Sequence, residues 1–176
     1  MNALDRAGTD RDAMLRGLQL LVLDFDGVLT DNRVLVHEDG TEAVWCHRGD
    51  GWGIARLRDA GMQIVVLSTE TNGVVAARCR KLGIDCVQGQ DDKGAALRLL
   101  LQTRAVAASR VAYVGNDVND LDCLQAVGVP IAVADATAPA RAAALFVTSL
   151  PGGFGAVREV ADWILAALAA PSAQTP

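Results

Sequence analysis

Four short apolar runs, separated by segments with helical periodicity, constrain the fold of this chain more than any other feature. They are LLVLD, QIVVLS, RVAYVG and VPIAVA, at residues 20–24, 63–68, 110–115 and 129–134. Continuous apolar runs of this length are typical of strands buried on both faces. The segments between them carry apolar residues at helical intervals and often end near a glycine. The alternation predicts an α/β fold: a three-layer, Rossmann-like parallel sheet with helices on both faces.

One segment departs from this alternation. The sequence NRVLVHEDGTEAVWCH has two extended runs around Asp39-Gly40, and Asp-Gly between such runs is a strong hairpin signal. We expect a protruding β-hairpin at 33–46, followed by a helix from about Gly51 to Ala60. A single domain at 17–169 accounts for the pattern, with flexible tails at 1–16 and 170–176.

Composition and charge exclude several classes of function. The net charge of −5, with both signs interspersed, gives no electrostatic footprint for nucleic acid or an anionic membrane. The four cysteines are scattered and include no CxxC pair, so neither a zinc site nor a disulfide framework is indicated. No apolar run is long enough to span a membrane, and the first 16 residues lack an apolar signal core. We therefore expect a cytoplasmic protein.

Two acidic residues end the first predicted strand. Asp24 falls at its carboxyl end and Asp26 just beyond, where ligands bind in parallel α/β sheets. Gly27 allows the backbone to approach closely there. A single aspartate in this position is usually a turn or a helix cap. Two neighbouring carboxylates repel each other unless a cation or a shared proton offsets the repulsion.

Further polar residues are expected at the same edge of the sheet. Ser68 follows the second run, Lys93 begins a helix, and Asn116 and Asp117 follow the RVAYVG run. Taken singly, each has an ordinary structural interpretation: Ser68 as a helix cap, Lys93 as a solvated lysine, and Asn116 with Asp117 as a turn. Together with Asp24 and Asp26 they indicate phosphoryl transfer.

That chemistry assigns a role to each group. A phosphate monoester dianion repels a carboxylate, so a hard cation such as Mg²⁺ would bridge them. Asp24 would attack phosphorus to give an aspartyl-phosphate, and Asp26 would protonate the leaving alkoxide and later deprotonate water. Ser68 and Lys93 would donate hydrogen bonds to the phosphoryl oxygens.

The motifs DFDGVLT, VVLS, Lys93 and GNDVND resemble those of the haloacid dehalogenase (HAD) superfamily. The resemblance implies that Asp24 and the backbone carbonyl of Asp26 ligate Mg²⁺. It places Asn116 as the third protein ligand, where the family usually has aspartate. A neutral amide contributes no charge, so Asp117 is an alternative ligand, direct or through water. Asp120 is expected to orient Lys93.

A narrower resemblance rests on DGVLTD, RGDGWGI, AVAD and GGFGAVREV. These are similar to phosphatases acting on 3-deoxy-octulosonate 8-phosphate and on nine-carbon KDN or N-acetylneuraminate 9-phosphates. Only residues 25–62 separate the first two runs, which leaves no room for a separate cap domain. The resemblance therefore implies a homotetramer in which subunits share active sites, closed by the hairpin and the GGFGAVRE segment. It also implies an association with a CMP-acylneuraminate synthetase.

The same resemblance suggests the residues that contact substrate. Eight-carbon-specific relatives tend to carry Gly-Arg after the second-motif hydroxyl, whereas this chain has Thr69-Glu70. Glu70 would accept bonds from sugar hydroxyls, and with Lys81 it favours a nine-carbon acid. The ordinary reading is that both residues suit the dipole of the intervening helix. Arg158 would meet the substrate carboxylate, or else pair with Glu159 or solvent. The expected substrate-binding residues are Thr30, Thr69, Glu70, Arg78, Lys81 and Arg158.

Two other functions remain open at this stage. The domain would be a non-catalytic oligomerisation partner of a sugar-nucleotide synthetase, for which Asn116 is the only support. Alternatively, it would be a HAD phosphatase for another small phosphate ester. Intact Asp24, Asp26 and Lys93 favour catalysis.

Overall fold

The computed structural model describes residues 11–170, which form a six-stranded parallel sheet flanked by helices. The strand order is β5-β4-β1-β6-β7-β8. All four residues of β1 are fully buried, which explains why this run is continuously apolar. The predicted α/β class is confirmed, and two short strands, β5 and β8, extend the sheet beyond the four apolar runs. The bounds are β1 Leu20–Leu23, β4 Gln63–Leu67, β5 Asp85–Val87, β6 Val111–Gly115, β7 Val129–Ala132 and β8 Phe146–Val147.

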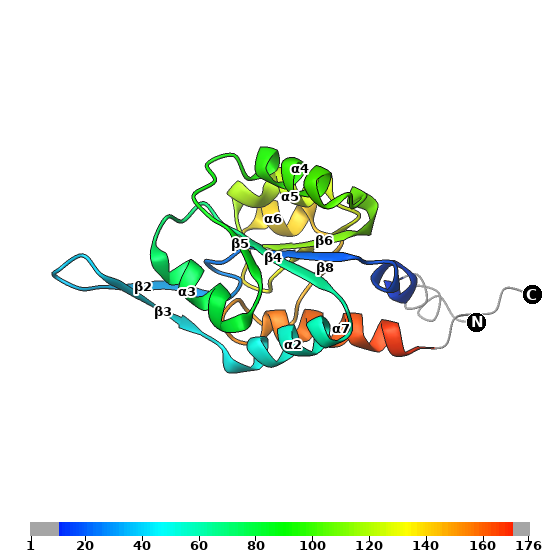
Figure 1. Cartoon of the computed structure of the whole chain (residues 1–176), viewed down its shortest axis with the longest axis horizontal. Helices are drawn as coiled ribbons and strands as arrows, with labels where there is room; N and C mark the ends of the chain where they lie inside the picture. Colours follow the sequence, from blue (N-terminus) through cyan, green and yellow to red (C-terminus); the bar gives the residue numbers. More distant parts are fainter. Residues whose placement is uncertain (1–10, 171–176) are drawn as a thin grey trace, which may run out of the picture.

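Helices cover both faces of the sheet. α4, α5 and α6 lie on one face and α2 and α7 on the other (Figure 1), while α3 contacts α2 and β5. β1 pairs with β4 on one side and β6 on the other, so the chain direction across the sheet reverses at β1. Ligands bind at such a switch point. The helices are α2 Arg48–Asp59, α3 Gly73–Leu82, α4 Lys93–Arg104, α5 Leu121–Ala126, α6 Ala138–Ala143 and α7 Ala156–Ala169, with 3₁₀ turns η1 Ala108–Arg110 and η2 Val118–Asp120.

The expected hairpin is present as β2 (Thr30–Val36) and β3 (Glu42–Cys46). It extends beyond the edge of the sheet at which β1 ends (Figure 1). β2 begins at Thr30, three residues earlier than expected, because this strand continues directly from the loop after β1. In this single chain the hairpin leaves large apolar side chains exposed, namely Val34, Leu35, Val36 and Trp45.

Two expected boundaries differ from the structure. α2 begins at Arg48 rather than near Gly51, with His47 as its N-cap. Residues 11–16, expected in the flexible N-terminal tail, are helical, and Leu15 is fully buried in the core. The rest of that tail and residues 171–176 lie outside the described residues. Across residues 11–170, no helix combines the length and the apolar character needed to cross a membrane.

Candidate active site

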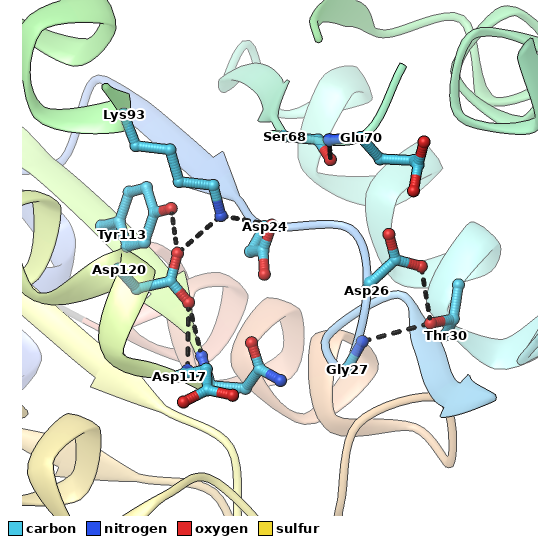
Figure 2. Close-up of polar contacts among 11 residues, drawn as sticks. Asp24, Asp26, Gly27, Thr30, Ser68, Glu70, Lys93, Tyr113, Asp117 and Asp120 are labelled. Atoms are coloured by element: carbon cyan, nitrogen blue, oxygen red, sulfur yellow. Dashed lines mark hydrogen bonds and ion pairs between the residues drawn. The ribbon is translucent and has the colours of Figure 1, made fainter. Parts of the chain in front are cut away.

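A buried lysine joins two aspartates at the carboxyl edge of the sheet. Lys93, at the start of α4, is 2% exposed, and its Nζ lies 2.6 Å from Oδ1 of Asp24 and 2.8 Å from Oδ1 of Asp120. Asp24 follows β1, and its backbone N–H donates to the carbonyl of Val114 in β6. Figure 2 shows the second carboxylate oxygen of Asp24 pointing away from Lys93. That oxygen is therefore free of the ammonium group.

Asp120 organises the loop that follows β6. The hydroxyl of Tyr113 donates to Oδ1 of Asp120 at 2.6 Å, and the backbone N–H groups of Asn116 and Asp117 donate to Oδ2 at 2.8 and 3.3 Å (Figure 2). Asp120 is fully buried. Both of its oxygens are thus satisfied, which a buried carboxylate requires. Lys93 and the 116–117 loop are consequently held by one side chain.

The charges in this cluster shift one another's pKa. Burial, together with Asp120, raises the pKa of Asp24 to about 7, although Lys93 acts in the opposite direction. Burial alone lowers the pKa of Lys93, but Asp24 and Asp120 outweigh it and the net shift is upward. Lys93 therefore stays protonated. A divalent cation at Asp24 would lower the pKa of this carboxyl and favour the ionised form.

Asp26 lies in the loop between β1 and β2, two residues after Asp24. Thr30 Oγ1 donates to Oδ1 of Asp26 at 3.4 Å and accepts from the backbone N–H of Gly27 at 3.1 Å (Figure 2). Gly27 has a φ of 82°, which favours glycine. Burial and the nearby Glu70 raise the pKa of Asp26. A raised pKa suits a carboxyl group that must deliver a proton near neutral pH.

Ser68 follows β4 and is 2% exposed. Its Oγ accepts the backbone N–H of Glu70 at 3.0 Å, which leaves the hydroxyl hydrogen free to donate. The carboxylate of Glu70 accepts the backbone N–H groups of Thr71 and Asn72 at the start of α3, at 2.7 and 2.8 Å. Glu70 therefore has a local structural role in addition to any contact with substrate.

Asp24, Asp26 and Ser68 line a cavity of about 180 Å³ in which most of the side chains carry oxygen atoms. Its lining is Asp24, Asp26, Asn32, Ser68, Thr69, Asn116, Asp117, Val118 and Asn119. No group of three His, Cys, Asp or Glu side chains in residues 11–170 is placed to hold a metal ion. Carboxylate, carbonyl and amide oxygens are nevertheless the ligands that Mg²⁺ takes, and Asp24 and Asn116 border the same cavity. A Cβ at Gly27 would lie 2.0 Å from Nδ2 of Asn116, so glycine leaves the space in which the Asn116 amide sits.

Of the remaining expected substrate residues, Arg78, Lys81 and Glu70 border other cavities of this chain. Arg78 and Lys81 line one of about 510 Å³ with Arg48 and Trp52, and none of these three cations forms an ion pair within residues 11–170. Glu70 lines a cavity of about 250 Å³ that includes Asp26. Thr69 lines the catalytic cavity, and Thr30 touches Asp26.

Arg158 also lies outside the catalytic cavity. It borders a cavity of about 380 Å³, and its Nε lies 2.8 Å from Oδ2 of Asp162, one helical turn further along α7. The ionic partner of Arg158 is therefore Asp162, whereas the sequence analysis considered Glu159 or solvent. Glu159 instead accepts the backbone N–H groups of Ser149 and Leu150, each at 3.0 Å.

The sequence analysis did not identify Tyr113 as part of the site, nor Asn32, Val118 and Asn119, which line the cavity. Tyr113 is the single tyrosine of the chain, and it lies in a fully buried strand two residues before Gly115. A buried tyrosine hydroxyl usually has a hydrogen-bond partner. That rule, applied to the RVAYVG run, would have indicated a polar contact near the strand end.

The parallel sheet, the carboxyl-edge cavity and the Asp24–Lys93–Asp120 cluster define a phosphatase of the HAD class. In agreement, residues 54–152 match the family model for haloacid dehalogenase-like hydrolases. Within that class, the chain belongs to the 3-deoxy-D-manno-octulosonate 8-phosphate phosphatase family. It is 38% identical over 156 residues to that phosphatase from Escherichia coli K12, covering 88% of this chain and 83% of the relative.

Solved structures give the same assignment. The 3-deoxy-D-manno-octulosonate 8-phosphate phosphatase of Moraxella catarrhalis, in complex with magnesium, phosphate and KDO, superposes with a TM-score of 0.87 at 32% identity, covering 90% of this chain and 92% of that one. A HAD family hydrolase from Streptomyces avermitilis is 54% identical with a TM-score of 0.83, covering 85% of this chain and 86% of the other. Residues 11–170 contain no separate cap domain, as the sequence analysis expected.

Proposed function

We propose that this chain hydrolyses the terminal phosphate of a sugar acid in a Mg²⁺-dependent reaction. The observation that carries the proposal is the cavity of about 180 Å³ that brings Asp24, Asp26 and Ser68 together beside the Lys93–Asp120 pair. Asp24, the Asp26 backbone carbonyl and Asn116 would hold the cation, with Asp117 as the alternative to Asn116. Bound there, Mg²⁺ would offset the repulsion between the ester dianion and the carboxylate.

The residues of the chain then divide the reaction into two steps. The Asp24 oxygen directed away from Lys93 attacks phosphorus, and the bond from phosphorus to the sugar oxygen breaks. Asp26 gives its proton to that oxygen, for which its raised pKa is suited. In the second step Asp26 takes a proton from water, whose oxygen attacks phosphorus and releases phosphate and free Asp24. Lys93 and Ser68 hold the phosphoryl oxygens in both steps.

The relatives indicate the class of substrate, and Glu70 indicates the number of carbon atoms in the sugar acid. The E. coli and M. catarrhalis relatives are 3-deoxy-D-manno-octulosonate 8-phosphate phosphatases, so an eight-carbon acid is the comparison substrate. Glu70 and Glu42 both line the cavity that adjoins Asp26. These carboxylates would accept hydrogen bonds from sugar hydroxyls, and the longer polyol of a nine-carbon acid 9-phosphate offers more of them.

A second copy of the chain would complete the site. The catalytic cavity contains no arginine, and its one neighbouring lysine is buried, whereas Arg48, Arg78 and Lys81 gather in another cavity without ionic partners among residues 11–170. A sugar acid needs a cationic group for its carboxylate. We therefore place Arg78 and Lys81 of one subunit opposite the catalytic cavity of the next. The exposed apolar hairpin would hold the subunits together, in a homotetramer.

Phosphate release from a panel of esters tests this proposal. The panel contains 3-deoxy-octulosonate 8-phosphate, KDN 9-phosphate, N-acetylneuraminate 9-phosphate and simple hexose phosphates, each with Mg²⁺ and with EDTA. We expect Mg²⁺-dependent release from the sugar acids, with the highest kcat/KM for a nine-carbon ester. Faster release from a hexose phosphate would point to another small ester. No release at all would leave the domain as an oligomerisation partner of a CMP-acylneuraminate synthetase, an association that co-purification tests directly.

A further inference from the structure

The first turn of α7 is capped by a residue from a different helix. Its own N-cap, Gly155, has a φ of 107° and supplies no side-chain acceptor. The first N–H groups of a helix have no partner within the helix. Here Oδ1 of Asp50, in the first turn of α2, accepts the backbone N–H of Arg158 at 2.8 Å, across 108 residues of sequence. Asp50 therefore determines where α7 begins relative to α2.

This cap is unusual in being a fully buried carboxylate. Asp50 is 0% exposed, and its second oxygen has no hydrogen-bond partner among residues 11–170. Burial raises the pKa of Asp50. The φ of 107° at position 155 disfavours a serine or asparagine there, so a local side-chain cap is not accessible to this helix. In contrast to a local cap, Asp50 connects α7 to α2.

The two helices are also in close contact beside Asp50. A Cβ at Gly53 of α2 would lie 2.9 Å from the Cβ of Ala161 and 3.2 Å from the Cα of Arg158. The first distance is shorter than Cβ atoms adopt and the second is tight, so a side chain at position 53 would push the two helices apart. α2 is thus a rigid support for the first two turns of α7.

The segment that enters α7 lies directly on the catalytic loop. The backbone N–H of Gly153 donates to the carbonyl of Val28 at 3.1 Å. A Cβ at Gly152 would lie 1.8 Å from the carbonyl oxygen of Gly27, and one at Gly153 would lie 2.3 Å from the backbone nitrogen of Asp31. Main chain therefore packs on main chain with no side chain between. The segment that leads into α7 and the loop that carries Asp26 are therefore in direct main-chain contact.

We propose that Asp50 is a positioning residue for the catalytic loop, acting through the first turn of α7 and Gly152-Gly153. Its carboxylate touches neither substrate nor metal in this scheme. It holds the backbone at residues 27–28 and, through that backbone, the side chain of Asp26. The role in catalysis rests on the proposed function, whereas the mechanical link does not. A displacement of about 1 Å in a catalytic group can reduce the rate up to about 100-fold.

The variants Asp50→Ala and Asp50→Asn test the proposal, since alanine removes the acceptor and asparagine keeps one. Arg56→Ala is the matched control, because Arg56 of α2 also joins the two helices, through Asp162 at 3.0 Å, and is not part of the cap. With the ester that the wild type hydrolyses best, Asp50→Ala should lower kcat at least about tenfold with little change in KM. Asp50→Asn should restore most of the rate, and Arg56→Ala should match the wild type.

Amide hydrogen exchange provides a readout that needs no activity. Peptides covering residues 25–31 should exchange faster in Asp50→Ala than in the wild type or Arg56→Ala, at a temperature where circular dichroism shows all variants folded. An Asp50→Ala protein with unchanged kcat and unchanged exchange at 25–31, or no rescue by asparagine, would refute the proposal. If Asp50→Ala does not fold, the wild type decides. Residues 25–31 and 156–158 should then open together, and independent opening would contradict the link.

Discussion

Lys93 Nζ lies 2.6 Å from Asp24 Oδ1 and 2.8 Å from Asp120 Oδ1, so one buried ammonium group neutralises part of two buried carboxylates. The arrangement leaves a net negative charge at the centre of the site. Removing one member of a buried ion pair typically destabilises a protein by about 3–5 kcal/mol when the remaining charge has no partner. The loss of Lys93 is therefore expected to lower the stability of the protein, whereas the loss of the Asp24 carboxylate is expected to lower its activity.

Asp24→Asn should abolish phosphate release while preserving the fold. The amide is not a nucleophile, so we expect kcat to fall by at least about 1,000-fold. Stability should change much less than the 3–5 kcal/mol above, since Lys93 keeps Asp120 as its partner. Phosphate assays and urea unfolding measure the two effects. Lys93→Met is the contrasting variant, because it leaves two buried acids without a cation and should lose stability strongly. Comparable activity in Asp24→Asn would rule out the nucleophile assigned here.

Asn116→Asp should strengthen metal binding. The substitution adds a negative charge at the cavity that also contains Asp24, and Mg²⁺ affinity rises with ligand charge. We expect the Mg²⁺ concentration for half-maximal activity to fall by about tenfold. Titration of activity with Mg²⁺ measures this shift. Asp117→Asn is the control: if it weakens Mg²⁺ binding while Asn116→Asp has no effect, Asp117 is the ligand.

Leu35→Asp should separate the subunits. Leu35 is 54% exposed on the hairpin, so the folded chain tolerates a charge there, whereas a buried subunit contact does not. We expect light scattering to show a smaller assembly, with kcat/KM for a sugar-acid phosphate reduced at least about tenfold. Leu99→Asp, at a 64% exposed position on α4, is the control and should leave both unchanged. A monomeric wild type would contradict the shared-site proposal.

Asp50→Asn should alter how stability depends on pH. Burial raises the pKa of Asp50 above its unfolded value of 3.8, so the folded state binds this proton more tightly than the unfolded state does. Ionisation of Asp50 therefore costs stability as pH rises from about 3.8 through the raised pKa, and asparagine removes that cost. The stability of Asp50→Asn relative to the wild type should increase as the pH rises above 3.8 and through the raised pKa of Asp50. Urea unfolding at several pH values measures the difference, and a constant difference would contradict the pKa shift.

The fold was largely predictable because its signals are local. A strand buried on both faces must be apolar along its whole length, as LLVL in β1 is, and Asp39-Gly40 specifies a tight turn between two extended runs. Parallel strands also bring their carboxyl ends to one edge, which is why Asp24, Ser68 and the 116–117 loop were expected to meet. Helix ends were less well predicted. His47 precedes α2 without a side-chain cap bond, so no typical capping residue marks the true start.

The sequence by itself thus determined the layered sheet, the hairpin and the set of polar residues at the strand ends. Apart from the expected pair of Asp120 and Lys93, only the tertiary structure decided which of them touch. Tyr113 bonding to Asp120 and Asp50 capping α7 depend on side-chain directions and on contacts between segments far apart in the chain. The structure also separated Arg78 and Lys81 from the catalytic cavity of their own chain. The physical reason is that periodicity encodes which face of an element is buried, whereas its neighbours across that face are chosen by packing of the whole molecule.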